Sequence, residues 1–102
     1  MIRHIVLVKF EDRISAAEID DIWRQLRDLQ DKVDGLVNIH AGRSGSPEQM
    51  ERGYMHGFTI DFTEWQALHA YLEHPDHKEL GGRLVAAAQG GIDGILVFDL
   101  EI

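Results

Sequence analysis

The stretch that decides the fold lies near the start of the chain and reads His4-Ile5-Val6-Leu7-Val8-Lys9-Phe10. Its middle residues are all β-branched or apolar, so both alternating faces of the extended chain are apolar. This pattern is typical of a strand that is covered on both sides. A similar stretch, Ile95-Leu96-Val97-Phe98-Asp99-Leu100, lies close to the other end. A sheet that contains these two strands needs an apolar partner on each of its faces.

The first of these strands is followed by a predicted helix over residues 15–35. Ser15-Ala16-Ala17-Glu18 has the pattern of a capping box, in which the serine oxygen accepts an amide of the first turn. Gly35 supplies the left-handed residue that commonly ends a helix. Apolar side chains spaced three and four residues apart form one stripe along the segment: Ile19, Ile22, Trp23, Leu26, Leu29 and Val33.

The rest of the chain predicts two more strands and a divided second helix. Residues 36–42 alternate apolar and polar side chains, and residues 54–62 alternate cleanly. Thr63-Glu64-Trp65-Gln66 has the form of a second capping box, and Pro75 divides the helical segment that follows it. The order βαββαβ predicts a ferredoxin-like α+β fold, with an antiparallel four-stranded sheet and helices on one face.

The two faces of this sheet require different partners. The helices are expected to cover the face that carries Val6, Val8, Phe58, Ile60 and Val97. The opposite face then carries Ile5, Leu7, Met55, Leu96, Phe98 and Leu100. Each of these apolar side chains contributes roughly 1.5 to 3 kcal/mol when it is fully buried. We therefore expect a homodimer through this open sheet face, in which two copies of the sheet pack against each other.

The composition limits the class of protein. A chain of 102 residues is one domain, residues 1–102, because a core of this size is not divided further. A net charge of -8, with Lys and Arg scattered singly, excludes a nucleic-acid partner. The chain has no cysteine and no apolar run that could cross a membrane. These features predict a cytoplasmic protein without a membrane partner.

Six histidines are many for a chain of this length, and two of them fall on the helix-covered face of the sheet. His4 shares that face with Val6, and His56 shares it with Phe58. Asp99 reaches the same face from the last strand. Core histidines that bond to backbone carbonyls are one explanation. A carboxylate and two imidazoles against an apolar wall favour instead the lining of a ligand cavity.

A second group of histidines surrounds the proline, in Tyr71-Leu72-Glu73-His74-Pro75-Asp76-His77. Since Pro75 ends one helix, His77 falls in the first turn of the next, where the positive end of the helix dipole lowers an imidazole pKa. A neutral imidazole can act as a base. An alternative is that His69, His74 and His77 bind a metal ion. No acidic residue or histidine at the spacing of zincins accompanies them, so we expect no metal.

Four segments of the chain resemble the stress-responsive A/B barrel domain family, also called Dabb. They are the strand at residues 3–10, the motif Gly53-Tyr54-Met55-His56, the motif Tyr71-Leu72-Glu73-His74-Pro75-Asp76-His77, and Val97-Phe98-Asp99. The resemblance extends over essentially the whole chain. It implies a ferredoxin-like protomer that forms a dimeric α+β barrel, which agrees with the fold predicted from the residues.

The resemblance also implies roles for individual residues. The best-understood enzyme of the family, a plant polyketide cyclase, performs an intramolecular aldol condensation without a cofactor, using a histidine and a tyrosine. By similarity of the motifs, the catalytic pair here is His77 and Tyr71, and no cofactor is expected. Some plant members bind magnesium through backbone carbonyls, which corresponds here to residues 33–36. The implied substrate-binding residues are the polar His4, His56 and Asp99 and the apolar Trp23, Leu26 and Phe58.

Three functions are open at this level. The first is a cofactor-independent cyclase or isomerase that acts on a small carbonyl or polyketide-like substrate, with His77 as base and Tyr71 as hydrogen-bond donor. The second is a protein that binds a small apolar or aromatic molecule in the same cavity and leaves it unchanged. The third is a stress-protective dimer with a filled core, which predicts no cavity of ligand size at these residues.

Overall fold

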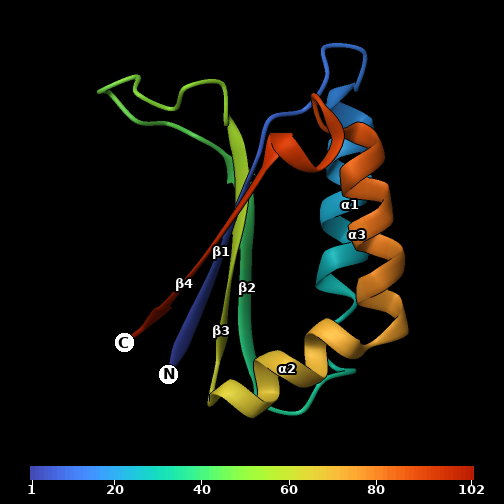
Figure 1. Cartoon of the computed structure of the whole chain (residues 1–102), viewed down its shortest axis with the longest axis vertical. Helices are drawn as coiled ribbons and strands as arrows, with labels where there is room; N and C mark the ends of the chain where they lie inside the picture. The colour runs from blue at the N-terminus through green and yellow to red at the C-terminus, as the bar shows by residue number, and fades with distance from the viewer.

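The chain follows the predicted order of strands and helices in the computed structural model, which describes residues 1–102 (Figure 1). The helices are α1 (Ala16–Arg27), α2 (Trp65–Glu73) and α3 (Pro75–Ala87), and a short 3-10 helix, η1 (Gly91–Gly94), precedes the last strand. As predicted, Pro75 divides the second crossover into two helices. The strands are β1 (Ile2–Val8), β2 (Leu36–Arg43), β3 (His56–Phe62) and β4 (Ile95–Glu101).

The four strands form one antiparallel sheet in the order β2-β3-β1-β4. This is the ferredoxin-like arrangement, so the predicted α+β fold is confirmed. In the register of the sheet, Val6 lies opposite Phe58 on one side and Val97 on the other. The two ends of the chain lie next to each other, and the Met1 amino group donates to the Ile102 carbonyl oxygen at 3.1 Å (Figure 1).

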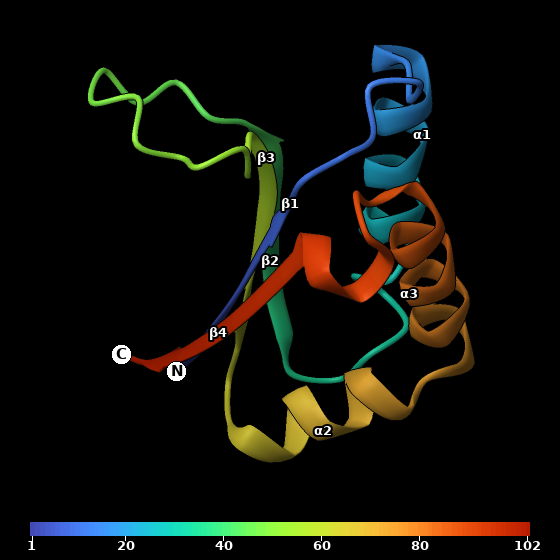
Figure 2. The ribbon, with the colours of Figure 1, turned by 45° about the horizontal axis from the view of Figure 1, so that its top comes forward.

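All three helices lie on the same side of the sheet, and its other face is bare (Figures 1 and 2). α1 and α3 run side by side over the sheet, while α2 crosses at one of its ends. The core between the two layers contains the fully buried Val8, Ile60 and Phe62 from the sheet and Leu26 and Tyr71 from the helices. No helix combines the length and the hydrophobicity that crossing a lipid bilayer requires.

The first helix begins as predicted but ends earlier. Ser15 caps α1, because its Oγ accepts the Glu18 amide at 3.1 Å. The helix ends at Arg27 rather than near Gly35, and residues 28–34 continue as turns. Amides in these turns donate to carbonyls three residues back, as in a 3-10 helix, so the chain continues in the direction of α1 with a tighter winding. The apolar stripe therefore stays buried beyond the end of the helix.

The second predicted capping box does not form. α2 begins at Trp65 with Glu64 in the cap position, and no side-chain oxygen accepts an amide of its first turn. Thr63 instead donates its amide to the Gly35 carbonyl at 2.9 Å. Gly35 has a φ of +86°, and a Cβ there would lie 2.7 Å from both the Ala67 Cβ and the Thr63 Oγ1. The close approach of this turn to α2 therefore requires glycine.

The edge strand β4 extends beyond the helices. Val97 points to the helix side but is 59% exposed, so the expectation that the helices cover it is wrong. The cause is the position of β4 at the edge of the sheet, outside the area that α1 and α3 overlie. On the bare face, Leu96, Phe98 and Leu100 are exposed as predicted. β4 thus presents apolar side chains on both of its faces.

Candidate active site

A cavity of about 310 Å³ lies between the sheet and the later helices, beside the uncovered strand β4. Its volume is near the lower end of the range for small-molecule sites. We call it the histidine cavity, after the two imidazoles in its wall. The residues that line it are His4, Val6, Phe58, Tyr71, Leu72, His77, Leu80, Gly81, Leu84, Val85, Ile92, Ile95 and Val97.

His77 is held by the break between α2 and α3. At the break the Asp76 amide donates to the Nδ1 of His74, at 3.1 Å, instead of to the Leu72 carbonyl. That carbonyl lies 3.1 Å from the Nδ1 of His77. Because a carbonyl oxygen only accepts, Nδ1 of His77 carries the proton, and Nε2 keeps its lone pair. The proline break thus fixes the tautomer in which Nε2 of His77 is a base.

The pKa of His77 is lowered, as predicted, but the main cause differs from the expected one. Burial lowers this pKa most, because a charged imidazole is disfavoured away from water. The hydrogen bond to the Leu72 carbonyl acts in the opposite sense, and electrostatic repulsion from the neighbouring His4, His74 and Lys78 lowers the pKa further. Near neutral pH the His77 imidazole is therefore uncharged.

Tyr71 lies against His77, with 4.4 Å between the two ring centroids. The side chain is fully buried, and its hydroxyl has no hydrogen-bond partner in the chain. Burial raises the pKa of this phenol far above its usual range, so the hydroxyl stays protonated. An unpaired O–H donor beside a neutral imidazole is the arrangement that could hold a substrate carbonyl oxygen.

His4 and Asp99 form a pair in the register of the sheet. They lie opposite each other on β1 and β4, and Asp99 Oδ1 is 2.6 Å from His4 Nδ1. His4 is 3% exposed and packs edge-on against Tyr71, with 5.8 Å between ring centroids. The partner of His4 is thus a carboxylate. The alternative that His4 is a core histidine bonded to a backbone carbonyl is therefore wrong. The carboxylate orients the ring with Nε2 on the opposite side.

Of the remaining predicted site residues, Phe58 lines this cavity, whereas His56, Trp23 and Leu26 lie away from it. His4 lies opposite Ile60, whereas His56 lies opposite Val8, so the two histidines are roughly 13 Å apart along the strands. His56 packs against Phe10 instead, with 5.3 Å between ring centroids. Trp23 and His56 line a different cavity, and Leu26 is fully buried and lines neither cavity.

The three histidines around Pro75 do not form a common site. His69 is exposed on α2, His74 caps α3, and His77 points into the histidine cavity. No three His, Asp or Glu side chains lie close enough together to hold a metal ion. The carbonyls of Val33 and Gly35, in the segment that corresponds to the magnesium site of some plant members, accept hydrogen bonds from the amides of Leu36 and Thr63.

Sequence reasoning missed the wall that α3 contributes to the histidine cavity. Leu80 and Leu84 are buried there at a spacing of four residues, and Gly81 lies between them. The spacing is a signal for one helix face. It does not indicate that this face borders a cavity, because a filled core requires the same spacing.

Comparisons with known proteins agree with this fold. The stress-responsive A/B barrel domain model matches residues 2–102. A solved dimeric ferredoxin-like protein of unknown function from Jannaschia sp. is 37% identical, with a TM-score of 0.92 over 99% of this chain and 98% of that chain. The stress-response A/B barrel domain-containing protein HS1 of Arabidopsis thaliana is 28% identical over 98% of this chain and 88% of that protein.

Olivetolic acid cyclase of Cannabis sativa is a more distant relative, 22% identical over 78% of this chain and 79% of the cyclase. The match of the family model over nearly the whole chain does not depend on any one of these relatives. This chain therefore belongs to the stress-responsive A/B barrel domain family.

Proposed function

We propose that this chain is a cofactor-independent enzyme that moves a proton next to a carbonyl group of a small apolar substrate, as a cyclase or isomerase. The observation that carries the proposal is the unpaired, buried hydroxyl of Tyr71 beside the free Nε2 of His77 in one cavity. The distant similarity to olivetolic acid cyclase supports a carbonyl or polyketide-like substrate.

The reaction begins with a proton transfer. Nε2 of His77 removes a proton from the carbon next to a substrate carbonyl, and the electron pair of the broken C–H bond forms the enolate. The Tyr71 hydroxyl donates to the enolate oxygen, where negative charge develops. In a cyclisation, the enolate carbon then bonds to a second carbonyl carbon, and protonated His77 returns the proton to the new alkoxide. The base is thereby regenerated.

The His4–Asp99 pair supports this chemistry by its position. His4 packs edge-on against Tyr71, and its ring is oriented by the carboxylate of Asp99. An imidazole fixed in this way restricts the rotation of Tyr71 and adds a third polar side chain, beside Tyr71 and His77, to a mostly apolar wall. We assign His4 and Asp99 as positioning residues.

The His77→Ala variant tests the proposed base. Its turnover number should fall about 10²- to 10⁴-fold, which is the usual contribution of general acid–base catalysis. His69→Ala is the matched control, because His69 is an exposed histidine on α2. Titration calorimetry with the same substrate shows whether the variant still binds it, and so distinguishes loss of the base from loss of the binding site. Normal turnover in His77→Ala would show that the base is assigned wrongly.

Ligand binding without chemistry is the second candidate, and the same cavity supports it. A cavity lined mostly by apolar side chains, with one free hydroxyl, could hold an apolar molecule with an oxygen function. Mass spectrometry after incubation with stoichiometric protein distinguishes the two, since a binder returns the ligand unchanged. The filled core predicted by the stress-protective hypothesis disagrees with the cavity at these residues.

We also propose that the working unit is a homodimer, formed through the bare face of the sheet. Leu96, Phe98 and Leu100 are 48%, 61% and 45% exposed on that face. Large apolar side chains gathered on one surface of a protomer are typical of an interface. The similar protein from Jannaschia sp. is described as dimeric, which supports the same assembly for this chain.

A further inference from the structure

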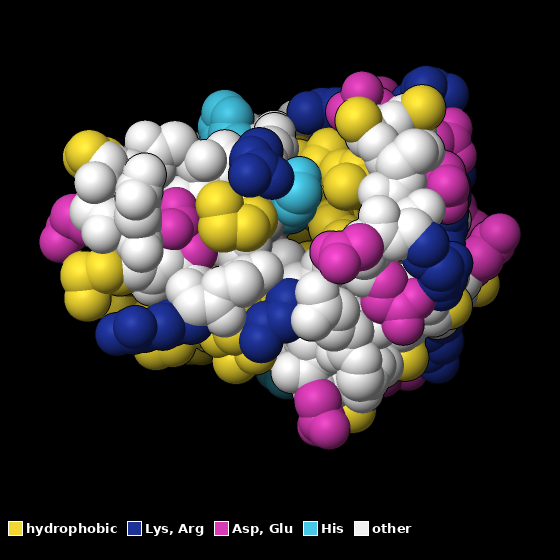
Figure 3. Space-filling view, turned by 90° about the horizontal axis from the view of Figure 1, so that it is seen from above, with side chains coloured by type: hydrophobic (Ala, Val, Ile, Leu, Met, Phe, Trp, Pro, Cys, Tyr) yellow, Lys and Arg dark blue, Asp and Glu magenta, His cyan; other side chains and the backbone are white.

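A second cavity, of about 710 Å³, lies between α1 and the end of β2 and is larger than the histidine cavity. Viewed from above, the molecule is hollowed between its protruding loop and its helices, with apolar side chains at the bottom and a histidine beside a basic side chain at the rim (Figure 3). We call it the arginine cavity. Its lining residues are Ile14, Ala16, Ile19, Asp20, Trp23, Arg24, Arg27, Ala41, Gly42, Arg43 and His56.

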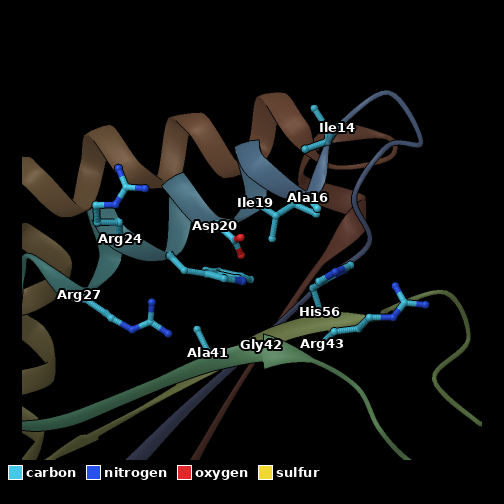
Figure 4. A pocket seen from close by; sticks show the side chains of 11 residues that line it. Ile14, Ala16, Ile19, Asp20, Arg24, Arg27, Ala41, Gly42, Arg43 and His56 are labelled. Carbon is cyan, nitrogen blue, oxygen red and sulfur yellow. The ribbon is translucent and has the colours of Figure 1, made fainter.

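Three of the ten basic residues of an otherwise acidic chain line this cavity. Arg24 is already paired with Asp21, at 2.9 Å. Arg27 and Arg43 make no ion pair, although other arginines of the chain do. Arg27 reaches from the end of α1 towards β2, and Arg43 extends from the end of β2 beyond His56 (Figure 4). Arg27 thus points towards the cavity, whereas the guanidinium of Arg43 lies at its outer rim and points away from it (Figure 4).

The other groups in the wall determine what these cations can bind. Asp20 is the one carboxylate in a lining with three arginines, so the wall carries a net positive charge even though Arg24 is paired with Asp21. His56 adds none near neutral pH, because burial and then the charge of Arg43 lower its pKa. Between the arginines the wall is apolar and includes Trp23. A monoanion with an apolar or aromatic body fits this pattern.

We propose that the arginine cavity binds an organic carboxylate, whose acidic group contacts Arg27 and whose apolar body lies against Trp23, while Arg43 at the rim attracts the anion from a longer distance. Guanidinium groups recognise carboxylates through charge-assisted hydrogen bonds. The aromatic wall contributes contact area for the body of the ligand. This site contains neither His77 nor Tyr71, so it does not depend on the proposed reaction.

The test compares naphthalene-2-carboxylate with its neutral isostere, naphthalene-2-carboxamide, by titration calorimetry on the full chain. The carboxylate should bind more tightly, and raising the salt concentration should weaken its binding. Arg27→Gln should weaken it about tenfold, the cost of one lost charge-assisted bond, and Arg43→Gln should weaken it less, because its charge acts from the rim. Arg52→Gln is the matched control, since Arg52 is an exposed arginine outside the cavity. This variant should bind the carboxylate as tightly as the wild type does.

Amide chemical shifts locate the bound probe. Binding in the arginine cavity should shift the amides of Ala16, Ala41 and Gly42, whereas binding in the histidine cavity would shift those of Gly81 and Leu84. The proposal is overturned by shifts in the second set, by equal affinity for the carboxamide, or by no binding at millimolar concentration. The proposal is also overturned if inorganic phosphate binds the cavity more tightly than the naphthalene carboxylate does, because the site would then favour phosphate.

Discussion

The hydroxyl group of Tyr71 is buried and makes no hydrogen bond within the chain. A buried polar group without a partner destabilises a fold by about 1 to 3 kcal/mol. Such a cost is common at functional sites, where a polar group is held ready for a ligand instead of being satisfied by the protein. At the scale of single residues, stability and function are therefore expected to respond to Tyr71 in opposite directions.

The Tyr71→Phe variant tests this opposition. Removing the unpaired hydroxyl should raise the free energy of unfolding by about 1 kcal/mol, because the ring still fills the same space. The same change should lower turnover about 10²-fold, since the enolate oxygen loses its donor. Urea unfolding and steady-state kinetics measure the two effects. A less stable variant would mean that the hydroxyl has a partner within the protein.

The lowered pKa values of His77 and His56 predict how stability depends on pH. Burial is the main cause of both shifts from 6.5. Below pH 6.5 and down to the lowered values, the unfolded chain binds more protons at these histidines than the folded chain does. The free energy of unfolding should therefore fall as the pH drops from about 7 to about 5.

Urea midpoints across this range measure the effect. His77→Ala should have a shallower dependence on pH, whereas His69→Ala should keep the slope of the wild type, because His69 is exposed. A wild-type stability that is constant or rises on acidification would contradict the burial of the neutral imidazoles.

At the scale of elements, the strands and the start of α1 could be predicted because their signals are local. Alternation assigns each strand residue to a face, and Ser15 caps the helix through an amide three residues away. The end of α1 at Arg27 could not be predicted, since the apolar spacing continues through the turns that follow. Local signals therefore locate most elements but not all of their ends.

The site itself was only partly predictable, for a similar reason. Alternation correctly places His4, His56 and Asp99 on the helix side of the sheet. It does not give the position of one strand along its neighbour, which depends on the register. The register brings Asp99 to His4 and carries His56 to the far end of the sheet. The histidines on the helix side therefore line two separate cavities, whereas the alternation predicted a single one.

The turn at Gly35 offers a test at this scale. The Gly35→Ala variant should lose more than about 1 kcal/mol of unfolding free energy, because alanine is strained at a positive φ and its methyl group would collide with α2. Gly82→Ala is the matched control: nothing lies within 4 Å of a Cβ there, in the middle of α3. The control should gain about 0.5 to 1 kcal/mol from helix propensity. Thermal unfolding of both variants gives the comparison, and a tolerated Gly35→Ala would contradict the described turn.

At the scale of the whole molecule, the exposed apolar face of β4 is the feature that most needs a partner. Phe98→Asp places a charge at its most exposed apolar position on the bare face, where Phe98 is 61% exposed. The variant should sediment as a monomer at concentrations where the wild type is a dimer. Trp65→Glu, a charge at an exposed aromatic residue on α2, should leave the dimer intact. A monomeric wild type at micromolar concentration would contradict the proposed assembly.

The first and last residues of the chain are hydrogen bonded to each other, with Ile102 donating its amide to the Met1 carbonyl at 2.9 Å. A linker of a few residues could therefore join them without disturbing β1 or β4. New termini could then be opened in the exposed loop between β2 and β3, which protrudes from the body of the molecule (Figure 2). Such a circular permutant would keep both cavities while reversing the order in which their walls are synthesised.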